Sequence, residues 1–263
     1  MSQRQLAFVV LALAVAGPSI ASPAHKAGGR PPAPAQVQGR TWAEVARLPD
    51  FTTGIWEIPL GPGAFTPGAQ PVLTPAYAAR LKAYADDQKA GKIQDSPSAN
   101  CVPPGMPQIM GQPYPIEIFY KPGQVTIQIE AYQQVRHIYT DGRRHPDDPD
   151  LTYDGDSVGH WDGDTLVVDS VGFTTDTPLG LSYGLRHSDK LHIVERMRLK
   201  DQDTLEIVTS IDDPEALTKP WATSRIFKRH RDWTIAEYVC EQNNRNLVDP
   251  TGRAGIVLAP PGH

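Results

Sequence analysis

Residues 116–230 consist of short alternating apolar and polar runs separated by tight turns, and this pattern restricts the fold more than any other feature. Pro122-Gly123 separates two such runs, and Asp162-Gly163-Asp164 separates two more. Tight turns between alternating runs are a strong signal for β-hairpins. The pattern predicts a mainly β protein in which about eight to ten strands follow one another as an antiparallel meander. A meander of this length hides its edges by closing, so we expect a lipocalin-like β-barrel rather than an open sheet.

The N-terminal residues have the features of a secretory signal peptide. Arg4 precedes an uncharged apolar run at 6–16, which is shorter than the roughly 20 residues of a membrane span. Small residues at Ser19 and Ala21 predict a signal peptide of residues 1–21, cleaved after Ala21. Residues 22–40 have almost no large apolar side chains and are expected to be a flexible leader. No later run is long enough to span a bilayer, so we expect a soluble, periplasmic or secreted protein.

The remaining chain is expected to form one domain followed by a tail. Its segments are a strand, helix and Pro-rich part at 41–115, the barrel at 116–246, and a C-terminal tail at 247–263. The first part should hold one or two N-terminal helices, at 41–50 and 73–91, and a strand at 51–60. Its Pro-rich stretch, 96–115, is expected to wrap the rim of the barrel. A last hairpin is expected at 225–241.

The two cysteines, Cys101 and Cys240, are far apart in the chain. An exported protein enters an oxidising compartment, so a disulfide between them is the expected state. The alternative is a catalytic thiol, which needs a free cysteine with a basic group nearby. Without CxxC spacing there is no signature of a zinc site.

Three acidic residues stand within apolar strand patterns. Alternation places Glu195 on one face with Ile193 and Met197, and it places Asp169 on one face with Val167 and Val171. Glu237 lies between Ile235 and Val239 in the same manner. A carboxylate inside a barrel must be paired, or its pKa rises. Two interpretations account for this pattern. The acidic residues are catalytic acids or bases, or they form structural ion pairs with Arg136 and Arg225.

His187 ends the long loop at 174–189, from which it can face a cavity mouth. We expect it to transfer a proton in partnership with Glu195 or Asp169. The other five candidate histidines are interpreted differently: His160 is a candidate for substrate binding and His137 for a metal site, whereas His145, His192 and His230 are expected to be surface or satisfied residues.

Arg136 and Tyr139 are the remaining candidates for substrate binding. The arginine can bind a substrate carboxylate through two hydrogen bonds. The phenol can donate to a phenolate or enolate oxygen.

The leading functional hypothesis is a periplasmic enzyme of the lyase, decarboxylase or isomerase type. It would act on a small apolar or aromatic molecule by acid–base chemistry without an organic cofactor. These reaction types fit best because no hydrolase nucleophile, such as a nucleophile elbow, is visible. A non-catalytic small-ligand carrier is the first alternative. A metal-dependent hydrolase is the second, and it requires three of five residues to converge: His137, His160, His187, Glu195 and Asp169. No local spacing predicts a metal site. The net charge of −5 lacks the basic stripe of a nucleic-acid-binding protein.

Several motifs in order resemble a family of exported bacterial proteins of mostly uncharacterised function. They are CVPPGMP, RHIYTDGR, GHWDGDTLVVD, HSDKLHIVER, DDPEALTKPW and EYVCEQNNR, and together they cover residues 95–246. The resemblance supports the boundaries of the domain and implies no particular activity.

Gly54-Ile55-Trp56 resembles the opening motif of lipocalin-like (calycin) barrels. The resemblance implies that Trp56 plugs one end of the barrel and that an arginine from the last strands packs over it. Arg225, Arg229 and Arg231 lie at the right place in the order of the chain.

Overall fold

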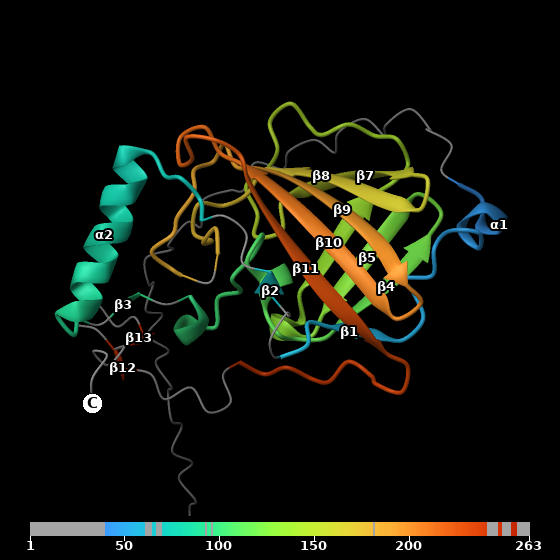
Figure 1. Ribbon diagram of the computed structural model, residues 1–263, viewed down its shortest axis with the longest axis horizontal. Coiled ribbons are helices and arrows are strands. Elements are labelled where there is room, and N and C mark those ends of the chain that lie inside the picture. The colour runs from blue at the N-terminus through green and yellow to red at the C-terminus, as the bar shows by residue number, and fades with distance from the viewer. Residues whose placement is uncertain are drawn as a thin grey trace, which may run out of the picture. The chain divides into compact units, whose positions relative to one another are not determined.

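The computed structural model describes residues 40–60, 65–66, 70–92, 94–95, 97–180, 182–240, 247–248 and 254–256 (Figure 1). All of them belong to one structural unit, Ala35–His263. The expected signal peptide at 1–21 and the leader up to residue 39 lie outside the described residues. Among the described helices, none is long and apolar enough to cross a membrane.

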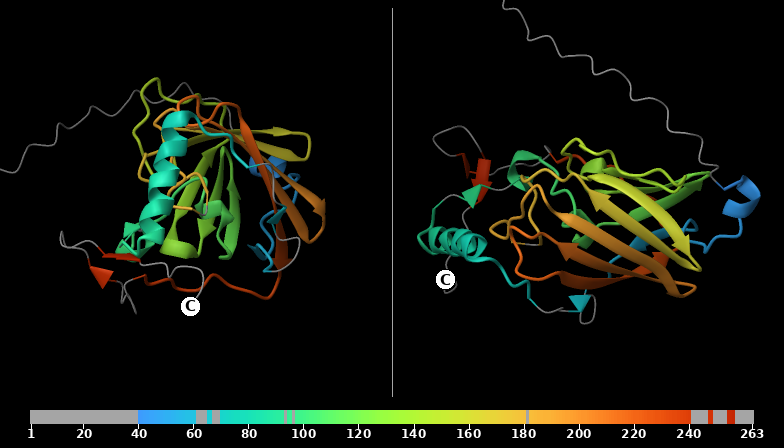
Figure 2. Two further views of the ribbon diagram at one scale, coloured as in Figure 1. Left: turned by 60° about the vertical axis from the view of Figure 1, so that its left-hand side comes forward. Right: turned by 90° about the horizontal axis from the view of Figure 1, so that it is seen from above.

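Nine strands close into a barrel, as the sequence predicts. In order around the wall they are β1 (Ile55–Glu57), β4 (Ile116–Lys121), β5 (Gln124–Ile129), β6 (Val135–Tyr139), β7 (Asp156–Asp162), β8 (Thr165–Val171), β9 (His192–Asp201), β10 (Thr204–Asp212) and β11 (Trp221–His230). The barrel closes where β11 pairs with β1, with Trp56 opposite Arg229. Figure 2 shows β4–β6 in green and β9–β11 in orange on opposite sides of the barrel. Closure removes the exposed strand edges that an open meander would leave.

One neighbouring pair in the wall is parallel. An odd number of strands cannot alternate in direction all the way round a closed barrel, so at least one pair must run the same way. Here that pair is β6 and β7, which share only two register pairs, Ile138 with Ser157 and Tyr139 with Val158. The segment 140–155 therefore crosses back along the barrel before β7 begins. The meander expected from the sequence is antiparallel everywhere else in this wall.

The remaining elements are short or lie outside the barrel wall. They are the helices α1 (Trp42–Val45) and α2 (Pro75–Lys89), the 3-10 turns η1 (Ser98–Asn100), η2 (Ile109–Gly111) and η3 (Ala131–Gln133), and the strands β2 (Phe65–Thr66), β3 (Gln94–Asp95), β12 (Leu247–Val248) and β13 (Ala254–Ile256). Strand β2 pairs with β11, and β3, β13 and β12 form a separate small sheet. Thr41 caps α1 together with Glu44. Thr74 precedes α2, but its hydroxyl donates to the carbonyl of Glu215 instead of capping the helix.

The hairpin expected at 225–241 does not form. The chain continues as β11 to His230, and residues 231–240 contain no strand. The physical reason is that β11 already pairs with β10 on one side and with β1 and β2 on the other, so no edge remains for a further strand. Glu237 is consequently exposed and not on an apolar strand face.

The Pro-rich stretch 96–115 lies deeper than the expected rim position. Met106, Ile109 and Met110 are buried and belong to the main hydrophobic core, together with inward residues of the strands such as Ile127 and Leu205. The segment therefore fills part of the barrel interior. Burial of these apolar side chains, two of which are unbranched methionines, contributes to the stability of the core.

The contact that the lipocalin-like motif implies is present. Trp56 is fully buried, and its indole nitrogen donates to the carbonyl of Phe51 at 2.8 Å. Of the three candidate arginines, Arg229 packs over the indole ring, with its guanidinium carbon 4.2 Å from the ring centroid. Phe51, Tyr120 and Trp161 form an aromatic cluster next to it.

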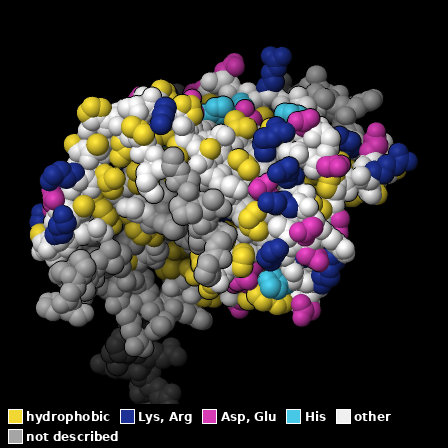
Figure 3. Space-filling model, in the orientation of Figure 1, with side chains coloured by type: hydrophobic (Ala, Val, Ile, Leu, Met, Phe, Trp, Pro, Cys, Tyr) yellow, Lys and Arg dark blue, Asp and Glu magenta, His cyan; other side chains and the backbone are white. Residues whose placement is uncertain are grey.

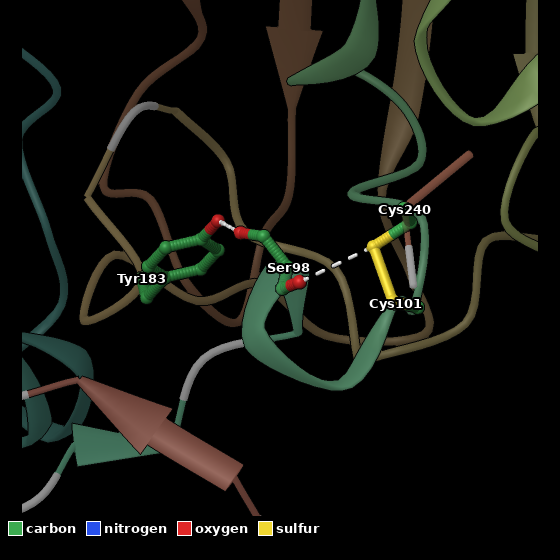
Figure 4. The surroundings of a disulfide bond; sticks show 4 residues. All are labelled: Ser98, Cys101, Tyr183 and Cys240. Carbon is green, nitrogen blue, oxygen red and sulfur yellow. Dashed lines mark hydrogen bonds between the residues drawn. A yellow bond between two sulfur atoms is a disulfide. The ribbon is translucent and has the colours of Figure 1, made fainter. Parts of the chain in front are cut away.

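Cys101 and Cys240 form the expected disulfide, with Cα atoms 5.5 Å apart. Figure 4 shows it beside Ser98, whose hydroxyl contacts the phenol of Tyr183 and whose carbonyl lies 3.7 Å from the sulfur of Cys240. The bond ties the Pro-rich segment to the chain that follows β11. A disulfide between these cysteines fits an oxidising compartment.

The outer face of β9–β11 carries mixed charges. Figure 3 shows lysine and arginine side chains intermixed with acidic ones over this face. Arg198 and Lys200 both pair with Glu206, and Arg196 pairs with Asp162.

Candidate active site

Glu195 faces the barrel interior, as the alternation of β9 predicts. It is fully buried, and one carboxylate oxygen lies 2.5 Å from a terminal guanidinium nitrogen of Arg136, which is also buried. The same nitrogen donates to the hydroxyls of Ser170 at 3.0 Å and Ser157 at 3.3 Å. The contact with Glu195 is an ion pair without hydrogen-bond geometry. Within the described residues, both carboxylate oxygens lack a hydrogen-bond donor.

The enclosed cavity beside Glu195 has a volume of about 20 Å³. Met106, Met110, Thr209 and Arg225 are among the residues that line it. A volume of this size holds about one water molecule. The buried carboxylate is therefore not placed to meet an organic substrate in this conformation.

Asp169 faces outward, which corrects the expectation that it shares the cavity with Glu195. Leu166 and Val168 take the inward positions of β8 and belong to the core. The prediction was wrong because both faces of β8 are apolar. The outer face is covered in part by the loop 146–151, against which Val171 lines a groove.

Two histidines expected to be ordinary surface residues contact Asp169. The same carboxylate oxygen lies 3.0 Å from Nε2 of His145 and 3.0 Å from Nε2 of His192. The other ring nitrogen of His145, Nδ1, lies 2.5 Å from a carboxylate oxygen of Asp156. The four residues form a continuous chain on the outer face of β7, β8 and β9.

His187 contacts neither of the carboxylates expected to be its partners. It is buried, with Nδ1 2.7 Å from the carbonyl of Ser188 and Nε2 2.6 Å from the hydroxyl of Thr177. Burial lowers the pKa of its imidazole and favours the neutral ring. In that state Nδ1 donates to the carbonyl and Nε2 accepts from the threonine, so His187 holds its loop together.

Tyr139 and Arg136 do not act on one ligand together, because they lie on opposite faces of β6. Arg136 is buried inside, whereas Tyr139 is on the outer face with Val135 and His137. The guanidinium of Arg143 stacks over the Tyr139 ring at 3.8 Å. His160, the remaining candidate for substrate binding, is exposed on the outer face of β7.

A groove of about 280 Å³ opens on the outside of the barrel, where β6 and β7 separate. Its walls include the titratable residues His137, Tyr139, Asp150, Asp154 and Asp156. Val135, Pro146 and Pro149 add apolar surface, and Ser157 separates the groove from the buried Arg136. A groove of this volume is close to the size of a site for a small molecule.

Asp154, like Asp156, is a residue of this groove that the sequence analysis missed. Burial raises the pKa of its carboxyl above the ordinary value, although the positive charges of Arg136 and His137 oppose this shift. Gln134 donates to one of its oxygens at 2.8 Å. The sequence signal was weak because Asp154 lies in a short DGD segment that is typical of a turn.

His137 lies close enough to Asp154 to influence its carboxyl electrostatically. Its Nδ1 accepts a hydrogen bond from the side-chain amide of Gln124 at 2.9 Å.

The residues proposed for a metal-dependent hydrolase do not converge. Glu195 is inside the barrel, Asp169 is outside it, and His187 is enclosed by its own loop. In the part of the chain that the structure describes, no three His, Cys, Asp or Glu residues are arranged to hold a metal ion.

Comparison with protein-family models and with curated proteins finds no match for this chain. The fold and the groove define a closed β-barrel with a cluster of acidic and imidazole groups on its outer wall.

Proposed function

We propose that the protein is an acid–base enzyme that binds a small carbonyl compound in the groove between β6 and β7. The observation that carries the proposal is Asp154, a largely buried carboxyl group of raised pKa in the wall of a groove of suitable size. Such groups gather at catalytic sites, because a proton donor must keep its proton near the working pH.

Asp154 and Asp156 take different roles in this proposal. Asp154 is the general acid and donates its proton to the carbonyl oxygen of the substrate. Asp156, whose carboxyl oxygen lies 2.5 Å from Nδ1 of His145, is the base and removes a proton from the neighbouring carbon. Return of a proton to another carbon completes an isomerisation, and loss of a leaving group completes an elimination. Neither reaction changes the overall oxidation state of the substrate, and neither requires an organic cofactor.

The groove also supports the expected nature of the substrate. Val135, Pro146 and Pro149 offer apolar contact to a small ring or short chain. Tyr139, which lines the groove, would donate a hydrogen bond to an enolate oxygen. The carrier hypothesis receives less support, since the enclosed cavity in the barrel has room for about one water.

We further propose that the enzyme works in the periplasm or outside the cell. The disulfide between Cys101 and Cys240 supports an oxidising compartment. The signal peptide expected at residues 1–21 provides the route of export.

Solvent deuterium tests the proposed chemistry without knowledge of the natural substrate. The protein is incubated in D₂O with 2-tetralone or cyclohex-3-enone, and mass spectrometry follows deuterium entering carbon. We expect the wild type to exceed the rate in buffer and Asp154→Asn to lower this rate about 100-fold. Asp150→Asn is the matched control, because it removes an exposed acid from the same groove. No incorporation above the buffer rate, or equal rates in wild type and Asp154→Asn, contradicts the proposal.

A further inference from the structure

The chain of four residues on the outer barrel face alternates acids and imidazoles. Asp156, His145, Asp169 and His192 are joined by contacts of 2.5, 3.0 and 3.0 Å between titratable atoms. They come from β7, the 140–155 segment, β8 and β9. A structural ion pair needs two partners, whereas here the two inner members each have partners on both sides.

We infer that these four residues form a proton relay and that His145 is its positioning residue. The inference rests on the proposed function, in which Asp156 receives a proton from the substrate. One end of the chain, Asp156, lines the groove. The other end, His192, has a side chain that is 41% exposed.

The relay gives the proton on Asp156 a path to solvent while the bound substrate blocks the direct path through the groove. The side chain of Asp156 is only 25% exposed, and a substrate that fills the groove covers it further. Water then cannot remove the proton from the substrate side. His192 is not among the residues that line the substrate groove, so its exposed ring meets solvent away from the bound substrate.

The proton balance closes at each step. Protonated Asp156 donates to the empty Nδ1 of a neutral His145 ring, whose Nε2 proton passes to Asp169. Asp169 passes a proton to Nε2 of His192, and the exposed ring releases one to water from Nδ1. Each group gains one proton and loses one, so the chain returns to its starting charge, and the proton of each ring has moved from one ring nitrogen to the other.

The charged groups near the relay are compatible with this route. Arg143 is paired with Asp141, which raises the pKa of its guanidinium. The negative charge of Asp156 adds to this increase. Both ring nitrogens of His145 contact carboxyl oxygens, so a neutral ring that carries its proton on Nε2 can donate to Asp169 and accept at Nδ1 from a protonated Asp156.

Nitrogen NMR of the full chain with ¹⁵N-labelled histidine tests the relay independently of catalysis. In a relay, protonation of His145 and protonation of His192 influence each other. The ¹⁵N chemical shifts of each ring should therefore change at both protonation steps as pH changes. In Asp169→Asn, the ¹⁵N shifts of each ring should change at one protonation step only. Asp162→Asn is the matched control, since it removes an exposed acid from the same barrel face outside the chain. Independent titration of the two rings in the wild type, or unchanged titrations in Asp169→Asn, overturns the inference.

Turnover separates this inference from the proposed function. In the deuterium assay, we expect His145→Gln to lower the rate at least 10-fold and added imidazole to restore part of it in His145→Gly. Full activity in His145→Gln beside inactive Asp154→Asn overturns the relay and leaves the proposed function standing. Absence of wild-type activity defeats the proposed function, while the NMR titrations still decide whether the coupled chain exists.

Discussion

Arg229 covers the indole ring of Trp56 at the seam where the last strand of the barrel meets the first. Its guanidinium donates to the carbonyls of Thr53 at 2.6 Å and Asp50 at 2.7 Å as well as stacking on the ring. The side chain of Arg229 is almost wholly buried. One residue therefore links β11, β1 and the segment that precedes β1.

We expect Arg229→Met to lower the free energy of unfolding by about 3 kcal/mol, because the carbonyls lose charged donors and the ring loses its cation. Arg229→Lys should recover less than half of this, since an ammonium group cannot reproduce the planar fork. Urea denaturation measures the changes. Arg231→Met is the control: Arg231 makes only an exposed pair with Asp203, so its loss should cost no more than about 0.5 kcal/mol. Equal losses in the two variants would contradict this account.

The buried pair of Arg136 and Glu195 should show strong coupling in a double-mutant cycle. Arg136→Met and Glu195→Met each leave one buried charge without its partner, which costs about 3–5 kcal/mol. The double variant removes both charges and should lose much less than the sum of the two. The exposed pair of Arg196 and Asp162 provides a reference cycle with coupling below about 1 kcal/mol. Additive losses at Arg136 and Glu195 would argue against a coupled pair.

The raised pKa of Asp154 predicts a specific pH dependence of stability. The folded carboxyl holds its proton above the ordinary value of 3.8, whereas the unfolded one does not. Wild-type stability relative to Asp154→Asn should therefore fall as pH rises from 3.8 through the folded pKa, and then stay level. Thermal unfolding of both variants across this range measures the difference. Asp150→Asn, at an exposed position of the same groove, is the control variant, and a flat result for Asp154→Asn would refute the raised pKa of Asp154.

His187 predicts a dependence of the opposite direction. Its folded pKa lies below the ordinary value of 6.5, so the unfolded state binds a proton that the folded state resists. Stability should be complete above pH 6.5 and decline as pH falls through this value. His187→Asn can keep the bond to the Ser188 carbonyl, and it should remove this decline while costing about 1 kcal/mol for the lost threonine contact. His160→Asn, at an exposed site, should leave the decline intact.

Local sequence patterns were sufficient for the barrel and for some of its buried residues. The turn at Asp162-Gly163-Asp164, the inward face of Glu195 and the pairing of Cys101 with Cys240 all depend on chemistry visible within a short window or on the cysteine content. The orientation of Asp169 could not be predicted in this way, because both faces of β8 carry mainly apolar side chains. The sequence also showed no sign of the role of Asp154, because its pattern is that of an ordinary turn residue. Asp154 lines a groove only because β6 and β7 separate at this point.

The parallel seam between β6 and β7 has a dynamic consequence. Two register pairs join these strands, against seven between β7 and β8. Local opening needs the least free energy where the fewest backbone bonds break together. Amide hydrogen exchange should accordingly be faster in β6 and the start of β7 than in β9 and β10. The groove between β6 and β7 can then widen to admit a ligand while the rest of the barrel stays folded.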